Sequence, residues 1–336
     1  MRKSIFSCSL ILITHLLNAQ TLGGSAIYNF LKLSPGPQLS AVGGTNISLI
    51  SQDVSTSWNN PALLRETMHK QLATNFTSFY AGIQNGHVQG AWHDEKFSTT
   101  FGLGVHYMHY GETTQTDVAG NIQGSFRPFD FAVHLSASRE FIDKWHFGTT
   151  LKYIQSSYGI YRSNALALDM GLNYYDSTKG WQMGFLARNM GTQLKTYGST
   201  GEDLPFDLQL GITRRVMSSP FQFSFTAQRI HQFDLIHNDT VFNANEGLNR
   251  NPDTWFNNLF RHFVFAAQIF PSEKIECSIG YNILRRAELG QLNQTNGITG
   301  ISFGLGVYLK KMQIRYARSH YQSNTGFNQF GLNLSF

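Results

Sequence analysis

FNQFGLNLSF, residues 327–336, is a strand pattern that runs to the last residue of the chain. Successive side chains of a strand point to opposite faces. The large apolar residues of this segment share one face: Phe330, Leu332, Leu334 and Phe336. Terminal residues usually fray unless something ties them down. A closing strand of a barrel is one such tie, so the segment predicts pairing between the end of the chain and its first strand.

The same alternation recurs through most of the chain, from about residue 72 onward. In each segment one face is large and apolar, as with Phe101, Leu103 and Val105, while the other is small or polar, as with Gly102 and His106. About fourteen strands are expected, at 72–80, 85–93, 98–110, 123–138, 144–155, 162–174, 180–189, 205–215, 220–230, 262–270, 274–284, 297–309, 312–320 and 327–336.

Alternation alone does not say which face is outside. A soluble sandwich or lipocalin would turn its large residues inward and cover the other face with Lys, Glu and Thr. Here the other face is rich in Gly, Ser, Asn and Gln, and charged residues make up only 14% of the chain. The average for globular proteins is about 25%. The composition therefore predicts an all-β fold, a transmembrane antiparallel β-barrel of about 14 strands whose large residues meet lipid.

The connections between the expected strands support this arrangement. Alternate connections, beginning with HDEKF and REFIDKW, are short, and most of those between them are longer and more variable. Bacterial outer-membrane barrels show this asymmetry, with short turns on one side and longer extracellular loops on the other. The pattern predicts a location in the cell outer membrane. The final strand also resembles the C-terminal signal by which such barrels are recognised.

The first residues have the layout of an export signal. MRKSIFSCSLILITHLLNAQ begins with Arg2 and Lys3, continues with an apolar run and reaches the small residue Ala19. This predicts a cleaved signal peptide at 1–19, with a short buried helix as the alternative. Cleavage would leave Cys277 as the only cysteine, which excludes a disulfide within one mature chain.

Residues 20–70 precede the barrel, which is expected at 71–336. This segment contains paired glycines, Gly43 and Gly44, and an Asn-Pro-Ala turn at Asn60, Pro61 and Ala62. Proline after asparagine favours a turn or the start of a helix. About fifty residues are too few for a separate domain, so the simplest prediction is a small N-terminal plug folded into the lumen. A disordered periplasmic leader is the alternative.

These residues also carry a resemblance. A plug with an Asn-Pro-Ala element ahead of about fourteen strands resembles the FadL-like barrels, which pass hydrophobic molecules. More closely, "GG…YNFLKL…AVGGTNISL…D…NNPALL", within residues 22–64, is similar to the PorQ family of outer-membrane barrels in the type IX secretion system of Bacteroidetes. One departure is Gly-Pro-Gln at 36–38, where relatives tend to carry Ser-Ala-Arg.

The resemblance to the PorQ family implies a non-catalytic protein that anchors a PorZ-like partner at the cell surface. That partner belongs to the type IX attachment complex, which cleaves cargo and links it to lipopolysaccharide with a sortase and a second FadL-like barrel. The alternative is a FadL-like channel for hydrophobic small molecules. The long connection 231–261 is the candidate partner-binding loop, and its candidate contact residues are Phe242, Asn249, Trp255 and Phe256.

Other chemistries are weakly indicated. The FGLGV segments at 101–105 and 303–307 lie within expected strands without a following helix, so they do not predict a nucleotide loop. His106 and His109 would face opposite ways, and no cofactor, metal site or nucleic-acid partner is expected. A third alternative, a barrel hydrolase, would use loop residues: Asp117, His231, Asp234, His237 and Asp239.

Overall fold

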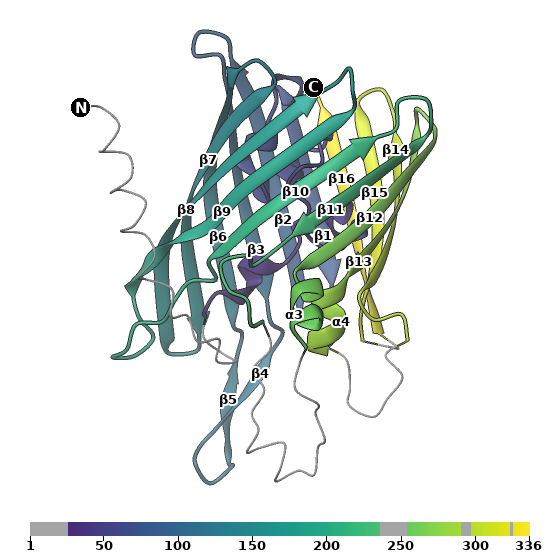
Figure 1. The fold of residues 1–336 in the computed structure, drawn as a ribbon. Helices are drawn as coiled ribbons and strands as arrows, with labels where there is room; N and C mark the ends of the chain where they lie inside the picture. Colours follow the sequence, from purple (N-terminus) through teal and green to yellow (C-terminus); the bar gives the residue numbers. More distant parts are fainter. Residues whose placement is uncertain (1–25, 236–253, 290–296, 323–324) are drawn as a thin grey trace, which may run out of the picture.

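The computed structural model describes residues 26–235, 254–289, 297–322 and 325–336. Within these ranges, fourteen strands form one closed antiparallel barrel (Figure 1). The predicted fold class is therefore confirmed. The barrel strands are β1 (Gln71–Ser78), β2 (Gln84–Asp94), β3 (Thr99–His109), β6 (Phe129–Ile142), β7 (Trp145–Tyr158), β8 (Tyr161–Asp176), β9 (Trp181–Lys195), β10 (Asp207–Arg215), β11 (Phe221–Ala227), β12 (Phe263–Ser272), β13 (Ile275–Asn282), β14 (Ile301–Tyr308), β15 (Met312–Gln322) and β16 (Thr325–Ser335).

The two faces of the wall are divided as the alternation predicts. Leu103, Leu135 and Leu151 point outward and are 51%, 48% and 53% exposed, whereas polar side chains such as His134 and Lys152 are fully buried in the lumen. Only a closed barrel or a helix can satisfy its backbone in hydrocarbon, and this wall offers its large apolar side chains to lipid. No helix in the described ranges is long and apolar enough to cross a bilayer.

The last strand closes the barrel. β16 pairs with β1 over eight residue pairs, from Gln71 opposite Ser335 to Ser78 opposite Asn328. The final backbone N–H, that of Phe336, donates to the carbonyl oxygen of Lys70 at 3.1 Å. The end of the chain is therefore fixed by a strand partner, and no barrel edge is left unpaired there.

The connections at the two ends of the barrel differ. At the end that holds the C-terminus, here called the turn side, the connections are short, as at 143–144 and 273–274. The opposite end, the loop side, carries the hairpin of β4 (Thr113–Thr116) and β5 (Ile122–Phe126) and the helices α3 (Trp255–Arg261) and α4 (Ile283–Leu289) (Figure 1).

The expected strand at 123–138 is wrong at its start. Residues 122–126 belong to the β4–β5 hairpin outside the barrel, and the wall strand begins only at Phe129. Pro128 stands between the two strands and has no N–H to donate to a ladder. The large apolar residues change parity across this proline, from Ile122 and Phe126 to Phe129 and Phe131, which one continuous strand cannot accommodate on a single face.

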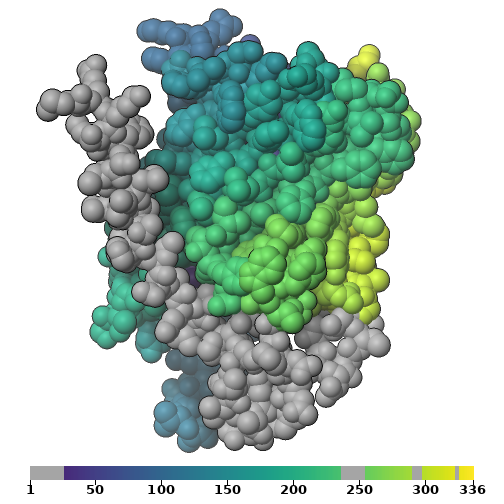
Figure 2. Space-filling view, in the orientation of Figure 1, coloured from purple at the N-terminus to yellow at the C-terminus, as the bar shows by residue number. Residues whose placement is uncertain are grey.

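The lumen is filled by the segment that precedes β1. Its short elements are η2 (Asn29–Lys32), α1 (Pro37–Ala41), η3 (Val54–Trp58), η4 (Pro61–Leu63) and η5 (Glu66–Met68). Every residue from 53 to 64 is buried, and in Figure 2 the purple atoms of this plug are almost entirely hidden behind the wall. The plug residue Leu39 packs with Val42 and Leu49 against Ala266 of β12.

Candidate functional site in the barrel lumen

The Asn-Pro-Ala segment forms a tight turn inside the barrel. Asn60 caps η4, because its Oδ1 accepts the N–H of Ala62 at 3.0 Å. Its Nδ2 donates to the carbonyl oxygen of Ile47 at 2.7 Å, which ties this turn to an earlier part of the plug. Pro61 occupies the first position of the turn, where an N–H would have no intrahelical partner.

The wall accommodates this turn with glycines. A Cβ added to Gly148 of β7 would overlap the backbone of Pro61 and Ala62, and one added to Gly171 of β8 would overlap the side-chain amide of Asn60. The turn therefore lies directly on the backbone of two neighbouring strands. Glycines within strands often mark such a close approach of another backbone.

Replacing Gly148 with valine should push η4 off the wall, because the neighbouring atoms are backbone and cannot rotate away. The expected loss of unfolding free energy is about 1–3 kcal/mol or more, which is typical of overpacking. Gly86→Val is the matched control, since a Cβ at Gly86 would meet no atom within 4 Å. Urea unfolding in lipid vesicles measures both, and equal stability of the two variants would contradict the close packing of plug and wall.

The paired glycines allow a second turn of the plug. Gly43 and Gly44 have φ of +96° and +93°, a conformation that side-chain-bearing residues rarely adopt. The carbonyl oxygen of Gly43 accepts hydrogen bonds from Asn282 Nδ2 and Arg285 Nη2, each at 3.1 Å. This turn therefore joins the plug to the loop-side end of β13 and to α4.

An aromatic cluster lies at the centre of the lumen. Trp58 is fully buried, and its ring lies 5.6, 4.9 and 4.7 Å from the rings of His87, His106 and His134, in edge-to-face geometry. His106 Nε2 is 2.6 Å from Asn85 Oδ1. Such aromatic contacts contribute about 0.5–1.5 kcal/mol each beyond their buried area. Through these contacts Trp58, the last residue of η3, is held against β2, β3 and β6.

A buried ion pair adjoins this cluster. Lys152 Nζ lies 2.5 Å from Asp169 Oδ2, and both side chains have no exposed surface. Lys152 also donates to Asn189 Oδ1 at 3.0 Å and lies 4.6 Å from the centre of the Trp58 ring. Asn189 sits at an irregularity in the β8–β9 ladder with φ of +56°, and its N–H donates to Asp169 Oδ1 at 2.8 Å. Both charges are thus paired within the wall.

A band of apolar residues faces inward in the loop-side half of the lumen. It consists of Met108, Ala132, Ile154, Ala165 and Ala167 on β3, β6, β7 and β8, and the buried polar side chains of Asp130, Ser156 and Ser163 follow it toward the loop-side rim. The plug residues Tyr28, Phe30 and Leu31 pack against this apolar band. Two polar contacts hold them: Tyr28 Oη lies 2.5 Å from Ser163 Oγ, and Arg188 Nη2 donates to the Leu31 carbonyl oxygen at 2.8 Å. Residues 27–33 therefore fill a space suited to an apolar molecule.

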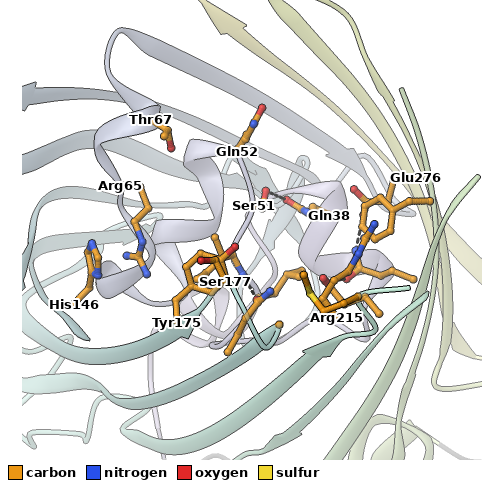
Figure 3. A pocket seen from close by; sticks show the side chains of 18 of the residues that line it. Gln38, Ser51, Gln52, Arg65, Thr67, His146, Tyr175, Ser177, Arg215 and Glu276 are labelled. Carbon is orange, nitrogen blue, oxygen red and sulfur yellow. Dashed lines mark hydrogen bonds between the residues drawn. The ribbon is translucent and has the colours of Figure 1, made fainter. Parts of the chain in front are cut away.

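The turn-side half of the lumen holds a polar cavity of 1190 Å³. Figure 3 shows Arg65, His146 and Tyr175 on one side of it, with Arg215 and Glu276 on the other. Arg65 Nη2 donates to Asn173 Oδ1 at 2.5 Å. Burial lowers the pKa of Arg65 to about 10, so its side chain remains cationic at neutral pH. This cavity suits water and polar groups, in contrast to the apolar band around Ile154.

The candidate partner-binding loop is described only in part. Phe242 and Asn249 lie outside the described residues. Trp255 and Phe256 are in the first turn of α3 and are 65% and 60% exposed. The Phe256 ring lies 4.5 Å from that of Phe260. These aromatic side chains are therefore available on the loop side.

The residues considered for a hydrolase have other contacts. Asp117 shapes the β4–β5 turn by accepting the N–H groups of Ala119 and Asn121, each at 2.9 Å. The His231 ring packs 4.9 Å from that of Phe206. His237 and Asp239 lie outside the described residues. In the part of the chain that is described, no group of three His, Cys, Asp or Glu side chains could hold a metal ion.

No protein-family model and no curated protein matches the chain. Among solved structures, the toluene transporter TbuX of Ralstonia pickettii matches with a TM-score of 0.54 and 12% identity, over 91% of this chain and all of TbuX. The deltaS2 mutant of the monoaromatic hydrocarbon channel TodX matches with a TM-score of 0.54 and 13% identity, over 91% of this chain and 99% of TodX. The monoaromatic hydrocarbon channel CymD matches with a TM-score of 0.51 and 13% identity, over 91% of this chain and 98% of CymD. At these identities the likeness shows the fold alone.

Sequence reasoning did not find the central cluster. Alternation assigns Lys152, Asp169 and His106 to the lumen, but it does not say which of them meet. The available signal is the presence of ionisable residues on the lumen face of long strands, where an unpaired charge is costly. Trp58 gives a second signal. It is a large side chain in a short plug, beside Asn59 and Asn60, and this indicates that it is buried against the wall.

Proposed function

We propose that this protein is an outer-membrane channel for small hydrophobic molecules, which enter through the loop-side half of the lumen. The observation that carries the proposal is the band of apolar inward-facing residues around Ile154, against which Tyr28, Phe30 and Leu31 of the plug pack. Residues 27–33 occupy this space and would have to move for a molecule to enter. The names of TbuX, TodX and CymD, which are similar in fold, support a substrate of the size and apolarity of toluene.

The location is part of the proposal. The apolar outer face and the fold support an outer-membrane site, reached after export through a signal peptide at 1–19. Residues 1–19 lie outside the described residues, so this peptide stays a prediction. In this proposal the chain consists of a leader, a plug that begins near residue 20, and the barrel from about residue 71.

Uptake of radiolabelled toluene by bacterial cells tests the channel, because their lipopolysaccharide leaflet slows the passage of such molecules. Expression of the chain should raise uptake several-fold, and Ile154→Asn should remove most of that gain by making the apolar band polar. Leu186→Asn is the matched control, since Leu186 is also fully buried but lies outside the loop-side apolar cluster. Uptake is divided by the amount of folded barrel in the outer membrane of each strain. A gain that survives Ile154→Asn, or no gain at all, would contradict the proposal.

Anchoring of a surface partner in type IX secretion is the second candidate. It is supported by the resemblance over residues 22–64 to the PorQ family and by the exposed Trp255 and Phe256 on the loop side. A stoichiometric PorZ-like surface protein that co-purifies with the barrel from native membranes, and is lost in Trp255→Ala, would favour this role. Purification without such a partner would count against it.

A further inference from the structure

The lipid-facing wall contains a groove of 510 Å³ across β9 to β13. Its floor is Ala267, an outward-facing residue of β12 whose register partners on the two neighbouring strands are Phe223 and Ile279. Those two side chains are 51% and 45% exposed, so they stand as walls on either side of a methyl group. Phe225, Phe265 and Tyr281 close the end of the groove nearer the loop side.

The groove is closed at its back. On the inner face of the same strands, Leu39 of the plug packs with Ala266. The backbone of Val42 and Gly43 lies so close to Gly280 that a Cβ there would overlap it. A molecule in the groove must therefore come from the bilayer and not from the lumen.

A cationic group lies at the turn-side end of the groove. Arg214 of β10 is opposite Phe223 on β11 and Trp181 on β9. Its guanidinium lies 4.4 Å from the centre of the Trp181 ring and donates to the carbonyl oxygen of Lys179, an exposed residue of the adjoining turn. Tryptophan and basic side chains gather at membrane–water interfaces, so this end of the groove is where a lipid headgroup would lie.

The charges around this end favour an anion. Lys179 and Arg214 are both basic, while the nearby turn between β12 and β13 carries one charge of each sign, Glu273 and Lys274. Asp176, the acidic residue just before the Lys179 turn, is already paired with Lys144 at 3.2 Å. A guanidinium recognises a phosphate through two parallel hydrogen bonds.

We propose that the groove binds one anionic phospholipid of the turn-side leaflet. An acyl chain lies over Ala267 between Phe223 and Ile279, and the phosphate accepts hydrogen bonds from Arg214 with Lys179 beside it. An apolar slot that ends at a basic group on the water boundary has the shape and charge of this lipid. A second copy of the chain would need an apolar ridge to fill the slot and an acidic group to meet Arg214.

Native mass spectrometry of the full-length barrel in mild detergent tests the site. The probes are palmitoyl-oleoyl phosphatidylglycerol and the phosphatidylcholine with the same chains. The wild-type barrel should retain one phosphatidylglycerol at least fivefold more often than phosphatidylcholine. Ala267→Phe should abolish retention of both by filling the slot, and Arg214→Gln should remove the preference while leaving the chains bound.

Matched controls lie on β6, outside the groove. Ala137 and Arg139 also face outward near the turn side. Ala137→Phe therefore adds the same ring outside the groove, and Arg139→Gln removes the same guanidinium outside the groove. Retention should be unchanged in both. Equal retention of the two lipids by the wild type, or loss of preference in Arg139→Gln as much as in Arg214→Gln, would overturn the proposal. A dimer that Ala267→Phe dissociates would also overturn it and would assign the groove to a second copy.

Discussion

Replacing Lys152 with methionine should lower the unfolding free energy of the barrel by about 3–5 kcal/mol, the usual cost of removing one partner from a buried ion pair. Asp169 would keep its charge with no exposed surface and no cation at 2.5 Å. Asn189 and Trp58 would each lose a contact with the ammonium group. Equilibrium urea unfolding in lipid vesicles, followed by tryptophan fluorescence, measures the change.

A double variant separates charge from packing. Lys152→Met combined with Asp169→Asn removes both charges and keeps an oxygen that can accept the N–H of Asn189, now 2.8 Å from Asp169 Oδ1. Neutral pairs often replace buried ion pairs at little cost, so most of the stability should return. A double variant as unstable as the single one would show that the lost contacts of the ammonium group with Asn189 and Trp58, and not an unpaired charge on Asp169, account for the loss.

The wall could be predicted from the sequence because each strand repeats the same evidence. Outward residues such as Leu103 and Leu135 are large in strand after strand, and a one-residue error in register would place them all in the lumen. The expected strand at 123–138 was wrong at its start because the large residues change parity at Pro128, between Phe126 and Phe129. The end of the chain could be predicted because Phe336 completes a pattern whose only stable partner is another strand.

The contents of the lumen could not be predicted in the same way. Lys152 and Asp169 meet because β7 and β8 have a particular register and because the β8–β9 ladder is irregular at Asn189, a non-glycine residue with positive φ. The path of the plug decides that Trp58 meets three histidines from β2, β3 and β6. Neither feature leaves a periodic signal. The apolar residues of the band around Ile154 are present in the sequence, but they form a band only when four strands are aligned.

Leu135→Arg should cost about 2–4 kcal/mol of folding free energy, the range for a basic residue facing lipid near the middle of the bilayer. Leu135 is 48% exposed and lies midway along β6, a strand that runs from Phe129 to Ile142. Its register partners, Leu103 and Leu151, face outward beside it and offer no polar group to an arginine. Folding into vesicles and urea unfolding measure the loss.

Two arginine variants with different surroundings test the reason for that loss. Phe141→Arg lies on the same strand near its turn-side end, where the side chain is 76% exposed and Arg139 is already tolerated. The cost there should fall to about 0–1 kcal/mol. Gln268→Arg faces the polar lumen cavity, where Gln268 donates to Glu276 at 2.6 Å, so an arginine would share with Arg315 a carboxylate partner that lipid does not offer. If all three variants lose the same stability, the outer face does not meet hydrocarbon, and neither a channel nor a lipid site could be built on this wall.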